Sequence, residues 1–183
     1  MSALTNIKSS EDAAPAEEGG PPSPQGETIQ VVGFHLGDEE YGLDIMRVQE
    51  IILLGPITLL PQVPDYVRGL INLRGRVLPV FDLRKRFGLS SCPSSDEQRI
   101  VIANIGGRIG GIIVDSVSQV ARFPVEAVEP PPKGVMRPEE NALKGIIKSE
   151  GRMVILLDID LLLGDEIGGI EAPCSHSEKT ENY

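Results

Sequence analysis

The sequence contains the same module twice, and this repeat limits the possible folds more than any other feature. Residues 69–88 (GLINLRGRVLPVFDLRKRFG) align without a gap with residues 145–164 (GIIKSEGRMVILLDIDLLLG), glycine on glycine. A second gapless alignment places residues 31–51 on residues 100–120. Self-similarity of this kind indicates a duplicated fold in which each half repeats one supersecondary unit.

Each module is predicted to be a β-hairpin followed by a short helical turn. In the first copy, two apolar runs, residues 69–73 and 77–83, flank a connection whose glycine supplies the positive φ of a tight turn. Asp82 then offers an N-cap carboxylate, and Gly88 offers a stop. Pro79 favours an edge strand or a bulge, because proline cannot donate to a β-ladder.

The remaining sequence predicts about five short strands in each half. Residues 29–45 form a first hairpin, residues 48–54 a third strand and residues 65–68 a single helical turn. Short strands punctuated by Gly and Pro indicate an all-β fold of two pseudo-symmetric five-stranded barrels, SH3/OB-like, with short helical turns. Barrel 1 is predicted over about residues 29–89 and barrel 2 over about 98–164, with exchange of an edge strand left open.

The charge of the chain is concentrated at its two ends. The net charge is −10, and residues 1–28 and 165–183 each contain one Lys against five acidic residues. Their low apolar content predicts a disordered acidic arm and a disordered acidic tail. The sequence shows no signal-peptide pattern and no apolar run near the ~20 residues that span a bilayer. We therefore expect a cytoplasmic protein without direct membrane insertion.

Most catalytic and metal-binding patterns are missing from the sequence. The two histidines, His35 and His176, and the two cysteines, Cys92 and Cys174, have no metal-ligand spacing. No glycine-rich loop precedes a helix with a phosphate-binding lysine. The carboxylates of the two modules occupy equivalent positions, which favours a repeated capping role over acid–base chemistry. The sequence predicts no enzyme activity, no cofactor and no metal.

Arg74, at the tip of the first hairpin, is the strongest candidate for a binding residue. Asn or Asp would adopt a tight turn more easily, and an arginine can meet a carboxylate in a bidentate fork. Glu50 lies within an apolar strand and is its predicted partner in an ion pair on a partly shielded surface. A solvated surface without function is the alternative reading. The second module has Glu150 where the first has Arg74, so the two copies differ at this position.

At these residues the sequence closely resembles the CheW family of bacterial chemotaxis coupling proteins. The matching segments are residues 36–51, 63–89 and 115–120, and the resemblance covers about residues 29–164. It implies two barrels around a shared apolar seam and a free-standing, non-catalytic adaptor. Such adaptors couple the cytoplasmic tips of chemoreceptors (methyl-accepting chemotaxis proteins) to the regulatory domain of the histidine kinase CheA, in membrane-attached signalling arrays.

Carried over position by position, the resemblance implies two contact regions. The receptor-binding residues are Val48, Glu50, Asn72, Leu73, Arg74 and Gly75, with Glu50 and Arg74 as the paired charges. The kinase-binding residues are Leu43, Asp44 and Ile45.

A barrel that binds single-stranded nucleic acid is the alternative function. Such barrels combine aromatic stacking with a basic groove. Aromatic residues make up only 4% of the chain, none is Trp, and residues 84–86 form one basic cluster where a groove needs a stripe. The composition therefore argues against a nucleic-acid partner.

Overall fold

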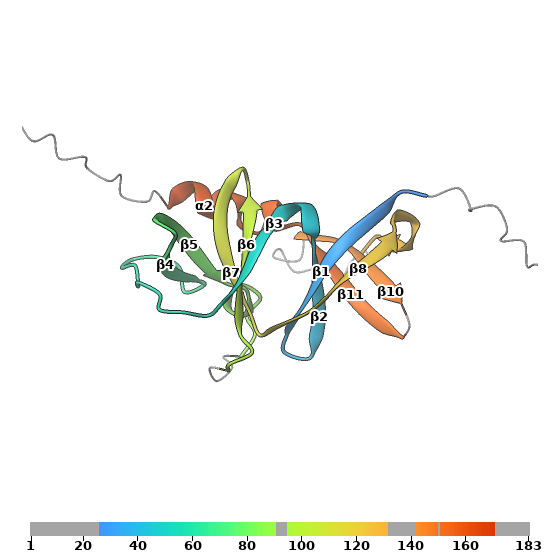
Figure 1. Cartoon of the computed structure of the whole chain (residues 1–183), viewed down its shortest axis with the longest axis horizontal. Helices are drawn as coiled ribbons and strands as arrows, with labels where there is room; N and C mark the ends of the chain where they lie inside the picture. Colours follow the sequence, from blue (N-terminus) through green and yellow to red (C-terminus); the bar gives the residue numbers. More distant parts are fainter. Residues whose placement is uncertain (1–25, 91–94, 132–141, 150, 171–183) are drawn as a thin grey trace, which may run out of the picture.

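The structure of the chain, a computed structural model, describes residues 26–90, 95–131, 142–149 and 151–170. Its strands form a six-stranded sheet and a five-stranded sheet. The six-stranded sheet contains, in spatial order, β8 (Ser116–Pro124), β1 (Thr28–Leu36), β2 (Glu39–Asp44), β11 (Arg152–Leu157), β10 (Leu143–Ser149) and β9 (Val128–Glu129). The five-stranded sheet contains β3 (Val48–Leu53), β6 (Arg99–Ile105), β7 (Arg108–Val114), β5 (Arg76–Asp82) and β4 (Val67–Leu73). Each sheet curls into a small barrel (Figure 1), which confirms the all-β prediction.

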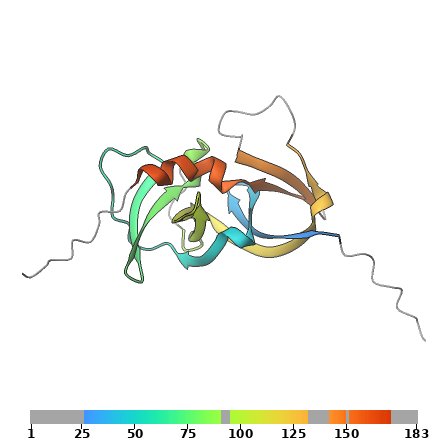
Figure 2. The same ribbon diagram turned by 90° about the horizontal axis from the view of Figure 1, so that it is seen from above.

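The described residues also include short helical segments between strands and a longer helix after the last strand. They are η1 (Ile45–Arg47), α1 (Leu83–Arg86), η2 (Val125–Ala127) and α2 (Ile159–Gly169). The predicted caps of the two modules are present: the Asp82 carboxylate accepts the Lys85 N–H at the start of α1, and Asp158 accepts two N–H groups at the start of α2. Seen from above, α2 leaves the junction of the two barrels and runs along the five-stranded one (Figure 2).

Each barrel combines strands from both halves of the sequence. The hairpin β1–β2 of the first half joins β10 and β11, while the hairpin β6–β7 of the second half joins β4 and β5 (Figure 1). The exchange is symmetric, because β2 pairs in parallel with β11 and β7 pairs in parallel with β5. Residues 29–89 and 98–164 are therefore the two halves of the sequence and not the two barrels in space. The halves exchange a whole hairpin, whereas the sequence left open the exchange of a single edge strand.

The hydrophobic core has a central cluster between the barrels and a smaller cluster within each barrel. The central cluster includes Phe34 and Leu36 of β1, Phe81 of β5, Ile105 of β6 and Leu162 of α2, all at most 2% exposed. Ile71, Val80 and Ile102 belong to the cluster of the five-stranded barrel, and Val31, Ile147 and Leu156 to that of the six-stranded barrel. Because the hairpins are exchanged, both halves contribute to the central cluster.

Two predictions about local structure in the first half are wrong. Residues 65–68 do not form a helical turn, because the chain turns at Asp65 and Tyr66 and enters β4 at Val67. Of the two alternatives given for Pro79, the edge strand is wrong, since β5 lies between β7 and β4, but its ladder with β4 has a bulge next to Pro79, between Val67 and Gly69. Pro79 is tolerated there because pairing with β7 begins only at Val80, so its missing N–H is not needed in that ladder.

The boundary expected at Gly164 is also wrong. Helix α2 passes through Gly164 and ends at Gly169, so residues 165–169 are helical rather than part of a disordered tail. Ile167 explains the extension, because its side chain is 2% exposed and packs in the central cluster. Glycine disfavours a helix by about 1 kcal/mol relative to alanine, and here the longer helix offsets this cost because it buries the apolar side chain of Ile167.

Several other predictions fall on residues outside the described part. Residues 1–25 of the acidic arm, residues 171–183 of the tail, Cys92, Cys174 and His176 lie there. The Pro-rich residues 124–141 contain the end of β8, η2 and β9, and residues 132–141 also lie outside the described part. Within the described ranges, no helix is long and apolar enough to cross a membrane.

Candidate protein-interaction site

The hairpin turn between β4 and β5 holds Arg74 in an uncommon backbone conformation. Arg74 has φ 52° and Gly75 has φ 82°, the pair of positive values that a two-residue hairpin turn of type I′ requires. The Asn72 side chain supports the turn, because its Oδ1 accepts the Gly75 N–H at 2.9 Å. An arginine in this left-handed region costs on the order of 1 kcal/mol relative to glycine. The local sequence therefore places a long cationic side chain at the tip at a measurable cost in stability.

Glu50 lies on β3, at one edge of the five-stranded sheet. Burial alternates along β3, and Val48, Glu50 and Ile52 share its less exposed face. Val48 packs against the central cluster and Ile52 against the cluster of the five-stranded barrel. The strand is thus fixed from both sides of Glu50, and the carboxylate remains 27% exposed.

Arg74 and Glu50 form an ion pair across the seam between the two edge strands. Arg74 Nη2 lies 2.8 Å from Glu50 Oε2. The seam is closed below the pair, where Thr58, after β3, exchanges two backbone hydrogen bonds of 2.8 Å with Leu70 of β4. Gly69 permits this approach, because a Cβ at that position would lie 2.0 Å from the Thr58 carbonyl oxygen. Residues far apart in sequence therefore meet at the surface as predicted for this pair.

The expected shielding of the pair is not observed. The Arg74 side chain is 78% exposed, so the pair is worth at most about 1 kcal/mol of stability, below the ~3–5 kcal/mol of a buried pair. The same exposure leaves most of the guanidinium accessible from outside the protein. Glu50 therefore orients the arginine without enclosing it.

The other residues predicted around Arg74 are also at the surface. Asn72 and Gly75 are exposed, and Leu73 is half-buried. Sequence reasoning missed Val77, which is the cross-strand neighbour of Asn72 and is 41% exposed. No alternation marks it, because β5 has two exposed residues followed by four buried ones. The turn thus presents two cations, Arg74 and Arg76, with one amide and apolar surface beside them.

The residues predicted to bind the kinase have a different arrangement. Leu43 is 1% exposed, so its side chain supports the region from inside and does not contact a partner. Asp44 caps η1 by accepting the Met46 N–H at 2.9 Å. Asp44, Ile45 and Met46 line an open groove of about 550 Å³ together with Ile29. Met46, which sequence reasoning missed, is 85% exposed and is the most prominent apolar side chain there.

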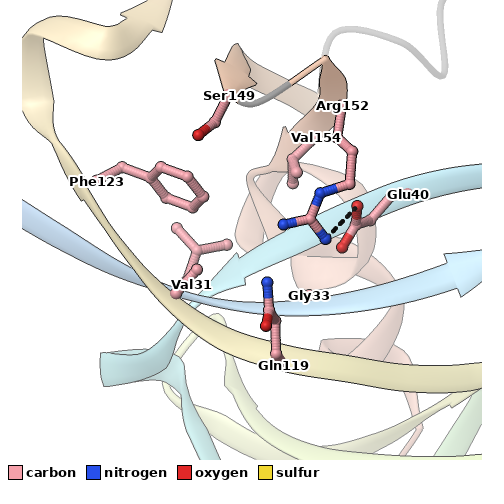
Figure 3. Close-up of a pocket in the computed structure, with 9 residues that line it drawn as sticks. Val31, Gly33, Glu40, Gln119, Phe123, Ser149, Arg152 and Val154 are labelled. Atoms are coloured by element: carbon pink, nitrogen blue, oxygen red, sulfur yellow. Dashed lines mark ion pairs between the residues drawn. The ribbon is translucent and has the colours of Figure 1, made fainter.

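The second copy of the module has no counterpart of the Arg74–Glu50 pair. Gln119 occupies the position equivalent to Glu50 and lies beside Arg152, which is paired with Glu40 at 4.0 Å (Figure 3). These side chains line a cavity of about 20 Å³. That volume holds about one water molecule and is far below the size of a ligand site. The second copy therefore has Gln119 and Glu150 in sequence where the first has the Glu50–Arg74 pair.

Comparison with known proteins identifies the family. The family described as "CheW-like domain" matches residues 30–166, nearly the whole described chain. The chain belongs to the CheW-like family. This assignment agrees with the resemblance in the sequence and with the exchanged pair of barrels.

The relatives of this CheW-like chain include proteins named for chemotaxis. The chemotaxis protein CheW of Klebsiella aerogenes is 37% identical over 143 residues, covering 77% of this chain and 86% of the relative. The protein FrzA of Myxococcus xanthus is 30% identical over 132 residues, covering 71% and 82%. The crystal structure of the scaffolding protein TtCheW from Thermoanaerobacter tengcongensis matches with a TM-score of 0.71 and 36% identity, covering 80% of this chain and 99% of that one. The chain is thus a scaffold protein of chemotaxis signalling, and the nucleic-acid alternative is not favoured.

The described part of this CheW-like chain offers little for chemistry. It contains no group of three or more His, Cys, Asp and Glu side chains that could hold a metal ion. His35 contacts Ser116 Oγ through Nδ1 at 3.4 Å, beside a strand and not in a catalytic arrangement. Burial, and next a hydrogen bond with Glu166, raise the pKa of Tyr66 to about 12. This tyrosine links α2 to the five-stranded barrel, which is a structural role.

Proposed function

We propose that this protein is an adaptor that couples the cytoplasmic tips of chemoreceptors to a CheA-type histidine kinase and performs no catalysis itself. The observation that supports this most strongly is Arg74, which occupies a strained turn conformation, is oriented by Glu50 and remains 78% exposed. Strain at a surface residue that gives little stability suggests selection for contact with a partner.

The receptor contact is proposed at the turn between β4 and β5. Arg74 suits a carboxylate on a helical receptor tip, because a guanidinium binds it with two parallel hydrogen bonds. Asn72 supplies an amide, and the half-buried Leu73 supplies apolar area beside the charge. Arginine surrounded by apolar contacts is a common arrangement at the centre of protein interfaces. Val48 and Glu50 hold the receptor-facing surface in position from β3.

The kinase contact is proposed at the groove beside η1. Asp44, Ile45 and Met46 line this groove, and its exposed apolar surface suits the regulatory domain of the kinase better than a charged ligand. Leu43 supports it from the core. With both contacts made, the protein would act in the cytoplasm within membrane-attached receptor arrays.

The proposal is tested by co-sedimentation with vesicles that display a chemoreceptor cytoplasmic domain, with and without a CheA-type kinase. We expect Arg74→Ala to reduce sedimentation with receptor vesicles strongly and to leave binding of the kinase unchanged. Lys148→Ala is a matched control, because Lys148 forms an exposed 2.7 Å pair with Glu129 on the equivalent hairpin of the second copy.

Two outcomes would contradict the proposal. Equal loss of receptor binding in both variants would mean that the contact is not specific to the Arg74 turn. Loss of kinase binding in Arg74→Ala with receptor binding intact would reverse the assignment of the two surfaces.

A further inference from the structure

Two ion pairs lie where the two halves of the chain cross. Arg84 at the start of α1 donates to the Asp115 carboxylate, in the connection from β7 to β8. Arg47, in the connection from β2 to β3, lies 2.5 Å from the Asp160 carboxylate at the start of α2. Each pair therefore joins the helix of one half to the connection of the other half that runs between the barrels.

In both places the carboxylate also holds the tip of a hairpin from the other barrel. Asp115 Oδ2 accepts the N–H of Gly37 in the β1–β2 turn at 2.7 Å. Asp160 Oδ1 accepts the N–H of Gly106 in the β6–β7 turn, also at 2.7 Å. We call each set of helix residue, connection residue and tip glycine a clamp.

The two clamps occupy equivalent positions, but their charges are reversed. Gly37 aligns with Gly106, and Arg84 aligns with Asp160, in the repeats. Asp115 aligns with Met46, so the connection residues Asp115 and Arg47 differ by one position in the alignment of the repeats. The cation stands on the helix in the first clamp and on the connection in the second.

The repeat defines a competing arrangement of the same strands, in which each hairpin joins the barrel of its own half. The hairpins β1–β2 and β6–β7 have similar lengths and burial patterns, and each could pair with the strands of its own half. In that exchanged arrangement each helix would meet the connection of its own half. Arg84 would then face Arg47, and Asp160 would face Asp115.

Such an arrangement places like charges in a partly buried setting. Arg84 and Asp115 are only 16% and 18% exposed in the native clamp, so repulsion there would be weakly screened. The Gly106 N–H would also face two cations and lose its acceptor. Ion pairs of this kind add little to stability but can fix register and pairing, since the wrong combination is penalised.

We propose that the reversed charges of the two clamps select which hairpin joins which barrel. Arg47, Arg84, Asp115 and Asp160 are thus pairing determinants of the duplicated fold. The size of core residues also distinguishes the hairpins, because Phe34 aligns with Ala103. The test therefore changes charges and leaves the core untouched.

Three variants separate pairing from stability. The double variant Arg84→Asp/Asp115→Arg keeps opposite charges in the native clamp. Both clamps then have the acidic residue on the helix and the arginine on the connection. In the exchanged arrangement each helix would therefore also meet an opposite charge. Arg47→Asp/Asp160→Arg does the same at the more exposed clamp, where the side chains are 44% and 31% exposed. The quadruple variant reverses both clamps and restores the difference between them.

The measurement is refolding from denaturant at several protein concentrations, followed by size-exclusion chromatography and amide NMR spectra. We expect wild type and the quadruple variant to give one monomeric species, and the double variants to give a second set of signals or oligomers at roughly a tenth of the protein or more. A double variant that fails to refold while the quadruple variant refolds also supports the proposal.

Other results would overturn it. If both double variants refold to the single wild-type species, the clamps do not select the pairing. If the quadruple variant shows the same second species as the double variants, or if all three fail to refold, then polarity is not the cause.

Discussion

The two hairpin–helix modules have the same backbone plan and different surfaces. Strands β4 and β5 with α1 repeat as β10 and β11 with α2, and an aspartate caps each helix. Helix α1 has four residues, three of them basic, whereas α2 has eleven and buries Ile159, Leu162, Leu163 and Ile167. Of the basic residues of α1 only Lys85 is exposed, because Arg84 pairs with Asp115 and Arg86 donates to the Leu162 carbonyl, whereas α2 closes the central core.

This difference shows how a duplicated fold divides its tasks. The strained Arg74 turn precedes β5, whereas α1 follows the other end of that strand, so the exposed turn lies away from the packed end of the first module. A helix that buries four side chains contributes to stability and leaves little freedom for new surface. The following experiments test the division, from the largest expected effect to the smallest.

The largest effect is expected from the apolar face of α2. Ile167→Ala removes a side chain that is 2% exposed, and we expect the free energy of unfolding to fall by about 2–4 kcal/mol. Leu161→Ala, on the same helix but 70% exposed, should change it by less than about 0.5 kcal/mol. Chemical denaturation measures both.

A chain shortened to residues 28–164 should show a similar loss, because Ile167 is removed with the rest. Equal stability of the shortened and full chains would mean that α2 beyond Gly164 does not contribute to the core, as the sequence alone suggests.

The boundary at Gly164 illustrates what the sequence could and could not predict. The repeat, the hairpins and both aspartate caps are local features, and the pattern of glycines and apolar residues is sufficient to predict them. The exchange of hairpins depends on contacts between distant segments, and periodicity contains no information about those. Gly164 resembles a helix stop in isolation, and only the burial of Ile167 in the assembled core overrides it.

Part of the candidate site could also be predicted from the sequence. An arginine at a hairpin tip and a glutamate within an apolar strand suggested the Arg74–Glu50 pair from chemistry alone. Its exposure was not predictable, because it depends on how far the turn projects from the barrel. Leu43 was misplaced for the same reason, since an apolar residue beside a turn can face either the core or a partner.

A smaller effect than that of Ile167 is expected from uncoupling the Arg74–Glu50 pair. Arg74→Ala and Glu50→Ala should each weaken binding to receptor vesicles by roughly 10-fold or more, about 1.4 kcal/mol, because the contact loses its charge or its orientation. The double variant should be no weaker than Arg74→Ala, since Glu50 acts through the arginine. A binding titration of the three variants measures this, and strictly additive effects would show that the residues act independently.

A third test uses the tyrosine that links the first half to α2. Burial, and next the hydrogen bond with Glu166, raise the pKa of Tyr66 to about 12, above the ordinary value of 10.0. A pKa raised by folding stabilises the protein fully below pH 10, and this stability is lost as the pH rises toward 12. Because the ring is partly exposed, we expect a loss of at most about 1 kcal/mol.

Tyr66→Phe provides the control for the pH dependence. Its stability should no longer fall through the Tyr66 titration between pH 10 and pH 12, as measured by denaturation at fixed temperature. The equivalent position in the second half is Ala142, so the link exists on one side only. An unchanged pH profile in the variant would assign the loss to another group.

The smallest effect, and the sharpest comparison between folding and function, is expected from Arg74→Asn. Asn-Gly is the preferred pair for this turn, so relief of the strain at φ 52° should stabilise the protein by about 0.5–1 kcal/mol. Loss of the exposed pair with Glu50 opposes this gain by at most about 1 kcal/mol, and the net change in the wild-type background should be close to zero. In a Glu50→Gln background the pair is already absent, so the same substitution should stabilise the protein by the full amount. Denaturation of the wild type, the two single variants and the double variant gives this difference, and receptor binding should be lost wherever Arg74 is replaced. If Arg74→Asn destabilised the protein in both backgrounds, the arginine would serve folding, and its strained conformation would no longer point to a partner.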